Sequence, residues 1–470
     1  MRAEHVSAVG CVVAAILAAL NGVGCAPSGA EGPWATPRPL GRDIPAYRPG
    51  DDSPDSAGAE PVFEEPAGVL TLRQALGLAL ARNPALAAVS WDVRATEAEA
   101  LQAGLMPNPE VRVSMVDFGG TGRLEGLRRS DQRIRLSQVI ELGGKARKRR
   151  RVGQLDAARS GWDYETARLN VLAETARAFV AVLVAQRRLV TAKDKHTSAE
   201  GIMAAITKRV AGGMAAGLEA AEVRAEVGAG RIELDHAQRA LASARGVLAG
   251  CWGGRTAAFE RVMGDLDALV DIPAVGQLLP KVTGSPDVAR WETEVSYREA
   301  AIELERANRI PDLRVLVGVQ RERDPTAHGY MVGLEMAVPI FDHNQGNLRR
   351  ARFRRIRAAH RRQAAVIAAQ TALHQAYEML SASSREVAVL KNDILPAAQE
   401  RADTAARGLQ LGAVTHLQVM KARRALFRAK GQLVEALGVF HTAVVDVERL
   451  IAEPIGDVGT AGGPQRGAPK

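Results

Sequence analysis

Residues 371–394, TALHQAYEMLSASSREVAVLKNDI, carry the pattern that decides the fold. Six positions in this stretch, apolar except for one serine, follow one another at steps of 4, 3, 4, 3 and 7 residues: Leu373, Tyr377, Leu380, Ser384, Val387 and Ile394. This heptad spacing is typical of helices that wind around partners in a left-handed supercoil. The surrounding residues 347–449 are interrupted only at Pro396 and at residues 411–415. We therefore predict a long coiled-coil hairpin, whose first arm would reach roughly 100 Å.

The chain contains the same plan twice. Residues 83–86 (NPAL) recur as residues 285–288 (SPDV), and residues 109–113 (PEVRV) recur as residues 311–315 (PDLRV). In both copies the second proline follows the first by 25 residues, which indicates an internal duplication. The predicted boundaries are residues 69–272 for repeat one and 273–455 for repeat two.

Each repeat is predicted to contain short helices and one long helical hairpin. In repeat one the long hairpin covers residues 145–248 and reverses at residues 211–217, which include three glycines. In repeat two it covers residues 347–449 and reverses at Gly412. When the reversals are aligned, the tips of both hairpins lie at a matching distance from the predicted sheet. The shorter helices are predicted at residues 72–82, 85–105 and 288–308.

Four runs alternate apolar and polar residues with a period of two, at residues 110–115, 133–140, 312–320 and 332–338. This alternation predicts β-strands. It is typical of a membrane barrel with lipid outside and water inside, although a soluble sheet with one buried face would look the same. Four strands leave open edges that cannot stand in lipid, so the barrel must be shared between chains, and three chains would supply twelve strands. The predicted fold is mostly α with a small β part, a trimeric α/β barrel.

The N-terminal residues 1–25 have the features of a secretory leader: a charge at Arg2, a mostly apolar run and small residues before Cys25. Residues 22–25 (GVGC) resemble the lipobox of bacterial lipoproteins, so we expect a lipid anchor at Cys25, with ordinary signal cleavage nearby as the alternative. Residues 26–68 are rich in Pro, Gly, Asp and Glu and are predicted to be an extended linker. Residues 456–470 are predicted to be a disordered tail. No other run approaches the roughly 18 consecutive apolar residues of a membrane helix.

Several classes of function are disfavoured. The net charge is +9, but no basic stretch is interleaved with aromatic residues that could stack on bases, so nucleic acid is not expected as a partner. His343, beside Asp342, has no second histidine at ligand spacing, and we read it as a turn residue. No arrangement resembles a nucleophile with its base, a phosphate loop or a paired-carboxylate site. We expect no enzyme activity, no cofactor and no metal site.

Two basic clusters follow the predicted strand-to-helix turns at equivalent places in the repeats. Cations in the first turns of a helix oppose its dipole, so we expect something to offset them. Our hypothesis is contact with phosphate head groups of a membrane at the rim of the barrel; the alternative is a solvated face that favours solubility. The residues concerned are Arg149, Arg150, Arg151, Arg349 and Arg350.

The chain resembles the TolC-type outer-membrane efflux family over about residues 69–452, in particular the branch that serves heavy-metal resistance pumps. The resemblance is carried by residues 70–76 (LTLRQAL), 83–84 (NP), 105–109 (LMPNP), 141–145 (ELGGK), 310–312 (IPD), 339–347 (PIFDHNQGN) and 394–396 (ILP). It implies a homotrimer in the outer membrane, with a shared twelve-strand barrel and a long periplasmic tube of coiled helices. It also implies docking, through the helix tips, on a periplasmic adaptor and an inner-membrane RND-type proton-driven pump.

The hairpin tips are the predicted docking surface, because small residues permit close approach of another helical hairpin and the family uses this region in that way. These residues are Gly213, Met214, Ala215, Ala216, Gly412, Ala413, Val414 and Thr415. Plain reversal loops are the alternative.

Some family members carry a carboxylate ring at the narrow periplasmic mouth. The matching positions here are Gln418 and Lys421, while Glu219 keeps the acid in repeat one. A complete ring of carboxylates would concentrate cations at the constriction. Because only Glu219 is acidic here, we expect weak selectivity for cations. The alternative is that the three are solvated tip residues.

The sequence favours a passive exit duct of a tripartite export system, with opening of the tips as the controlled step. The resemblance implies heavy-metal cations as cargo. A periplasmic coiled-coil adaptor or scaffold is one alternative, against which the four strands count. A duct for drugs or for type I protein secretion is another.

Overall fold

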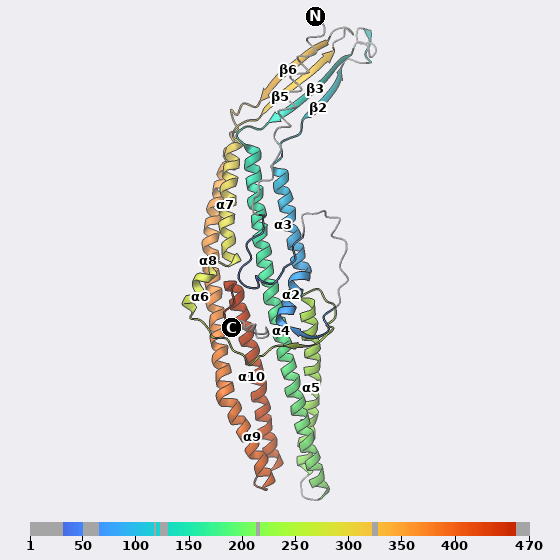
Figure 1. Cartoon of the computed structure of the whole chain (residues 1–470), viewed down its shortest axis with the longest axis vertical. Helices are drawn as coiled ribbons and strands as arrows, with labels where there is room; N and C mark the ends of the chain where they lie inside the picture. Colours follow the sequence, from blue (N-terminus) through green and yellow to red (C-terminus); the bar gives the residue numbers. More distant parts are fainter. Residues whose placement is uncertain are drawn as a thin grey trace, which may run out of the picture.

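The computed structural model describes residues 32–49, 65–116, 119–122, 130–212, 217–321 and 328–456. A β-sheet lies at one end of the molecule, two helical tips lie at the other, and long helices run between them (Figure 1). The predicted leader with Cys25, the first predicted tip at residues 213–216, and residues 457–470 of the predicted tail lie outside the described residues.

The predicted helical framework is confirmed. The helices of repeat one are α2 (Leu72–Arg82), α3 (Pro84–Ala103), α4 (Lys145–Ala211) and α5 (Gly217–Gly250). Those of repeat two are α6 (Val275–Val282), α7 (Pro286–Ala307), α8 (Gln345–Val389), α9 (Leu395–Gln410) and α10 (His416–Ile451). Both α3 and α7 begin with a proline, whose fixed φ and missing N–H suit the first helical position.

The heptad seam of the second hairpin is confirmed in its upper part and wrong at its end. Leu373, Leu380 and Val387 are fully buried, but Ile394 is 43% exposed. A π-helical turn, Leu390–Ile394, lies just before Pro396. Proline lacks an N–H and its ring crowds the carbonyl four residues back, so a wider turn there relieves the clash. The extra residue rotates Ile394 off the seam.

The four predicted strands form one antiparallel sheet in the order β2-β3-β5-β6. They are β2 (Glu110–Val116), β3 (Asp131–Ile140), β5 (Leu313–Arg321) and β6 (His328–Met336). Strand β6 ends before Val338, which the alternation had placed in it; Pro339 follows and cannot donate a ladder hydrogen bond.

The register of the sheet separates an apolar face from a polar one. The apolar face contains a row of four opposed residues, Val113, Ile134, Val319 and Tyr330, and all four are exposed. The next row lies on the other face and consists of Ser114, Arg133, Gln320 and Gly329. A side-chain period of two produces this segregation only when all strands share one register.

Strand and long helix are joined by a left-handed residue in both repeats. Gly143 and Gly144 precede α4 with φ of 73° and 68°, and Asn344 precedes α8 with φ of 56°. The two halves of the molecule meet at the first of these turns, where Lys145 Nζ lies 2.6 Å from Asp312 Oδ1 of repeat two.

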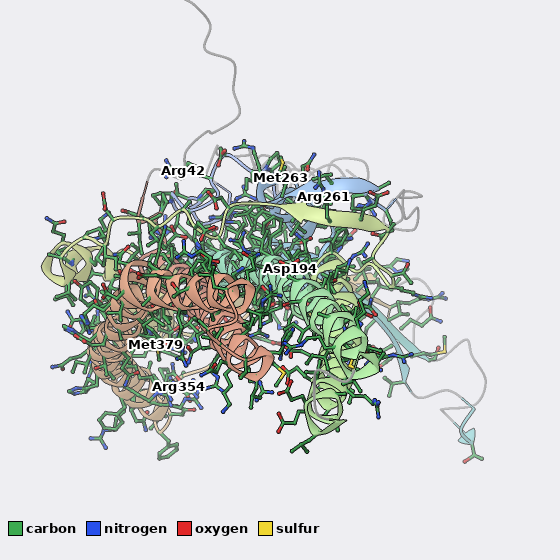
Figure 2. All side chains as sticks on the ribbon, turned by 90° about the horizontal axis from the view of Figure 1, so that it is seen from below. Arg42, Asp194, Arg261, Met263, Arg354 and Met379 are labelled. Atoms are coloured by element: carbon green, nitrogen blue, oxygen red, sulfur yellow. The ribbon has the colours of Figure 1, made fainter. Side chains whose placement is uncertain are left out.

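The long helices form a curved layer. In the half next to the sheet the order across the layer is α3, α4, α7 and α8, and in the half next to the tips it is α5, α4, α10 and then α8 with α9 (Figure 1). Seen from below, Arg42, Arg261 and Met263 lie on one side of this layer and Met379 and Arg354 on the other (Figure 2). One window of α4 is apolar enough to cross a membrane, but half of it is buried inside the molecule, so helix packing accounts for its composition.

Two features of the middle region were not predicted. Strands β1 (Gly68–Thr71) and β4 (Phe259–Met263) form a short parallel sheet. Residues 32–49, which belong to the predicted linker, contain no helix or strand, yet Trp34, Leu40, Ile44 and Ala46 pack against the core formed by α2, α3 and α4.

Candidate functional site

The second tip is a short, well-defined helix reversal. Helix α9 ends in a Schellman motif, in which Ala413 N donates to Gly408 O at 2.8 Å and Gly412 N donates to Leu409 O at 3.1 Å. Gly412 has φ of 75°, the left-handed conformation that this motif requires. Leu411, at the outermost point, is 84% exposed. This tip is therefore a hydrogen-bonded turn that exposes one large apolar side chain, Leu411.

Helix α10 begins with a capping box that involves one of the predicted constriction residues. Thr415 accepts a hydrogen bond from Gln418 N at 3.3 Å, and Gln418 Oε1 accepts one from Thr415 N at 2.8 Å. The Gln418 side chain is thus folded back on its own helix end. Lys421 lies three residues further along α10, on the neighbouring turn, and is exposed.

The third predicted constriction residue, Glu219, lies near a histidine that sequence reasoning missed. His416, the first residue of α10, is buried, and its Nδ1 lies 2.9 Å from Arg209 Nη1 near the end of α4. Burial lowers the pKa of His416 below its ordinary value, Arg209 lowers it further, and Glu219 acts in the opposite direction. His416 therefore connects the two hairpins close to their tips. Its place directly after the predicted break was the one available signal in the sequence.

The two hairpins are also linked by apolar packing near the tips. Met420 of α10 is buried against Ile202 and Ile206 of α4 and Ala220 and Val223 of α5. The opening of the tips would have to separate or slide this small cluster together with the contact between His416 and Arg209.

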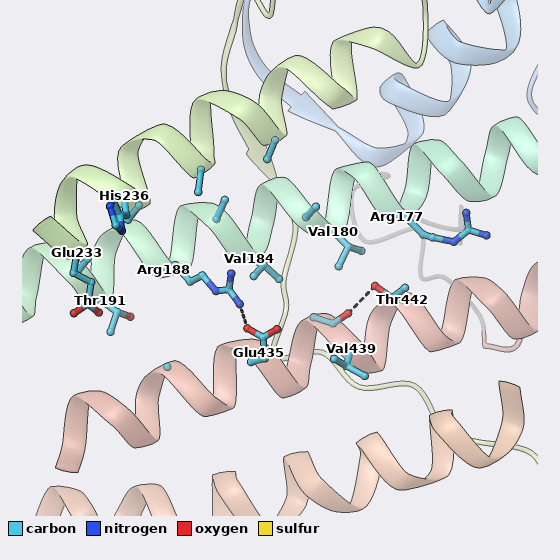
Figure 3. A pocket seen from close by; sticks show the side chains of 18 of the residues that line it. Arg177, Val180, Val184, Arg188, Thr191, Glu233, His236, Glu435, Val439 and Thr442 are labelled. Carbon is cyan, nitrogen blue, oxygen red and sulfur yellow. Dashed lines mark hydrogen bonds and ion pairs between the residues drawn. The ribbon is translucent and has the colours of Figure 1, made fainter. Parts of the chain in front are cut away.

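An open groove of about 760 Å³ lies on one face of the helical layer, lined by residues of α4, α5, α8 and α10 (Figure 3). Its floor is apolar, with Val180, Val184 and Val439. Ion pairs bridge it from α4 to α10: Arg188 with Glu435, and Arg177 Nε with Asp446 Oδ1 at 2.8 Å. The groove could not be predicted from sequence patterns, because its walls come from both repeats.

Within the groove the acidic side chains face cations. Glu233 Oε2 lies 2.5 Å from Lys195 Nζ, and the other two carboxylates have the arginines described above. In the part of the chain that the structure describes, no group of three or more His, Cys, Asp or Glu residues could hold a metal ion.

The three basic residues of repeat one differ in their contacts and in their exposure. Arg149 is held by Glu141, with Nη2 to Oε2 at 2.8 Å, and donates to the carbonyls of Ala103 and Leu105. These hydrogen bonds with Glu141 are the main reason that the pKa of Arg149 is raised. Arg150 packs against Gly104, and Arg151 is exposed. Arg149 is thus a structural link between α3, α4 and the end of β3.

The basic residues of repeat two lie on an open surface. Arg349 and Arg350 are exposed and line a shallow depression with Phe353, Arg354 and Arg357. The structure brings these five side chains together and leaves them accessible.

A duplicated chain of this form, with a four-stranded sheet above paired helical hairpins, belongs to the outer membrane efflux protein family. The model of that family matches residues 75–254 and 282–453, which is one segment in each repeat.

Among curated relatives, the chain is 32% identical to the cobalt-zinc-cadmium resistance protein CzcC of Cupriavidus metallidurans, over 83% of this chain and 92% of that protein. It is 29% identical to the nickel and cobalt resistance protein CnrC of the same organism, over 65% of this chain and 72% of that protein. A solved structure of CusC superposes with a TM-score of 0.69 at 17% identity, over 87% of this chain and 99% of that one, which confirms the fold.

Proposed function

We propose that this chain is the outer-membrane exit duct of a tripartite RND-type efflux system and passively conducts heavy-metal cations from the periplasm to the exterior. The observation that carries the proposal is the arrangement of two helical hairpins of matching length beneath a sheet with one exposed apolar face. Membership of the outer membrane efflux family supports it.

The sheet supplies the argument for the membrane and for the trimer. Its apolar face carries exposed Val111, Val113, Val332 and Leu334, which water would disfavour and lipid would not. Strands β2 and β6 are the edges of the sheet, and an open edge leaves backbone groups unsatisfied in lipid. Three copies joined through these edges would close a barrel of twelve strands. In the homotrimer the curved helical layers would continue the barrel as a tube.

The cargo is inferred from the relatives and from the groove. CzcC and CnrC are named for resistance to cobalt, zinc, cadmium and nickel. If the groove faces the duct, its carboxylates, which are already paired with arginine or lysine, would not retain a cation. Hydrated cations would then pass through water, and the pump would select the metal. No reaction and no cofactor are required of this chain.

Docking would occur at the tips. The turn at Gly412 to Thr415 and the predicted tip residues 213–216 of repeat one would meet a periplasmic adaptor, which connects the duct to the pump. The constriction at Glu219, Gln418 and Lys421 would be weakly selective, since only the first is acidic. Contact of Arg150, Arg151, Arg349 and Arg350 with lipid head groups, and acylation of Cys25, stay predictions.

Two neighbouring residues of β6 test the membrane assignment. Val332 points to the apolar face and Met331 to the polar face of the same strand. Val332→Arg should prevent recovery of trimers from the outer membrane, because arginine on a lipid-facing strand costs about 2–4 kcal/mol near the bilayer centre. Met331→Arg should leave trimers in the detergent-extracted outer membrane.

Equal recovery of both variants would contradict the proposal, because both side chains would then face water. In cells that lack other ducts, metal accumulation should vary inversely with trimer recovery: high with Val332→Arg, which yields no trimers, and low with Met331→Arg, which keeps them.

A further inference from the structure

The segment that precedes β1 is bound to the body by specific contacts. We call residues 33–48 the N-terminal strap. Tyr47 N donates to Leu80 O at 2.9 Å, Leu40 N donates to Ala452 O at 3.1 Å, and Trp34 packs edge-on against Tyr164. The strap therefore touches α2 and α4 of repeat one and the end of α10 in repeat two.

A buried ion pair on α4 is completed by the main chain of the strap. Glu165 is 0% exposed and Arg168 2%. Glu165 accepts from Arg38 N at 2.7 Å, and the Arg168 guanidinium donates to the carbonyl oxygens of Arg38, Leu40 and Gly41 at 3.1 to 3.3 Å. Burying two charges is favourable only if their remaining donors and acceptors are satisfied. Here the strap satisfies them, so α4 contains a site built for this peptide.

The position of the strap along α4 is fixed by shape as well as by charge. A Cβ atom on Gly161 would lie 2.0 Å from the carbonyl oxygen of Pro33, so glycine is required for the strap to lie there. Further along, Tyr164 Oη donates to Tyr47 O at 2.7 Å. The strap can therefore not slide along α4 without losing these contacts.

This docking limits how far the preceding chain can reach. Gly161 lies 16 residues after Lys145, the first residue of α4 beneath the sheet, which corresponds to about 24 Å along the helix. Cys25 precedes Pro33 by eight residues, which span at most about 26–29 Å when fully extended. The fully extended chain from Cys25 to Pro33 is therefore only slightly longer than the distance along α4 from Gly161 to the helix start beneath the sheet.

We propose that the N-terminal strap is a spacing device: its docking on α4 fixes the distance between the helical body and a membrane anchor at Cys25, and the intervening residues contain almost no slack. This inference rests on the proposed function, since it needs acylated Cys25 in the inner leaflet and the sheet in the membrane.

Changes in spacer length test the device in the full-length chain. Deletion of residues 27–30 shortens the reach by about 13–14 Å, so a lipid in the membrane and a docked strap become incompatible. Trypsin cleavage after Arg42, the strap arginine that is not followed by proline, should then increase at least tenfold in membranes. Insertion of four Gly and Ser residues at the same place should leave cleavage unchanged.

Release of the strap provides the matched control. Gly161→Leu removes the space for Pro33, and Arg38→Pro removes the N–H that Glu165 accepts while leaving α4 intact. In either background trypsin should cleave the strap readily, and the deletion should cause no further increase. Cys25→Ser should abolish the effect of the deletion in the otherwise unchanged chain.

The mass of the mature N-terminus identifies the cause of a failure. If Cys25 is acylated and the deletion leaves the strap protected, the spacing device is refuted. If Cys25 carries no lipid, the device is refuted as well. In both cases the duct is judged separately, by the recovery of the Val332→Arg and Met331→Arg trimers.

Discussion

Substitution of Gly412 separates the conformation of the second tip from its surface. Gly412 has φ of 75°, and no atom lies within 4 Å of the position that a Cβ would occupy. A new side chain there meets open space, so its effect comes from the backbone alone. The left-handed conformation costs an ordinary L-residue about 1–2 kcal/mol relative to glycine, whereas asparagine adopts it readily.

For Gly412→Val this penalty lowers the population of the native turn by a factor of about 5–30. The two hydrogen bonds of the Schellman motif would be lost together with the turn, at about 0.5–1.5 kcal/mol each. Neither loss reaches the cores near the middle of the molecule, so the trimer should remain intact.

We expect Gly412→Val to reduce cross-linking to the adaptor and to raise cellular metal, while Gly412→Asn behaves like the unchanged chain. Trimer recovery from the outer membrane is the control for both variants. If Gly412→Asn is as damaging as Gly412→Val, the shape of the surface and not the turn conformation governs docking. If neither variant has an effect, this tip is not a docking surface.

Two further predictions concern charged residues. Acid should loosen the tips, because protonated His416 can no longer accept a hydrogen bond from Arg209 and becomes a second cation beside that arginine. The pKa of His416 is lowered, so the contact is intact at pH values above the ordinary 6.5 and weakens only as the pH falls below that value. Hydrogen exchange at about pH 7.5 and about pH 5 measures this, and His416→Gln, which stays neutral, should remove the difference; the same difference in that variant would refute the role of His416. Arg149→Ala should lower the thermal midpoint of the trimer, since it removes charged hydrogen bonds to half-buried Glu141 worth about 1.5–3 kcal/mol. Arg151→Ala, at an exposed position, should leave the midpoint unchanged. Equal midpoints for the two variants would show that the Arg149 contacts do not stabilise the trimer.

The sequence predicted the elements that depend on periodicity. The patterns located both long hairpins, the short helices α2, α3 and α7 and the four strands of the large sheet, apart from the end of β6 at Val338, because heptad and alternating spacings report local geometry directly. Ile394 was misplaced because a heptad count assumes an uninterrupted α-helix, and the turn before Pro396 is a π-helix.

Contacts between distant segments could not be predicted in the same way. Residues 32–49 lack any periodicity, and their Pro-rich composition is also that of a free linker. Glu165 and Arg168, spaced three apart on a helix, look like a surface pair, and only the fold reveals that the strap covers them. The capping role of Gln418 was missed as well: alignment with acidic residues of the family led to a predicted place at the constriction, which stays a prediction, while the structure shows its side chain capping α10.

The charges of the groove bear on how a duct of this kind could open. Arg177 with Asp446 and Arg188 with Glu435 join α4 to α10, and all four side chains are more than a third exposed. Exposed pairs of this kind contribute about 0–1 kcal/mol each, far less than a buried core. Below the middle region the two hairpins are therefore held together by weak, exchangeable ion pairs, by the contact of buried His416 with Arg209 and by one small apolar cluster. Sliding of one hairpin along the other would replace these pairs with water at little cost, so the tips could move while the strap and the buried cores hold the upper half in place.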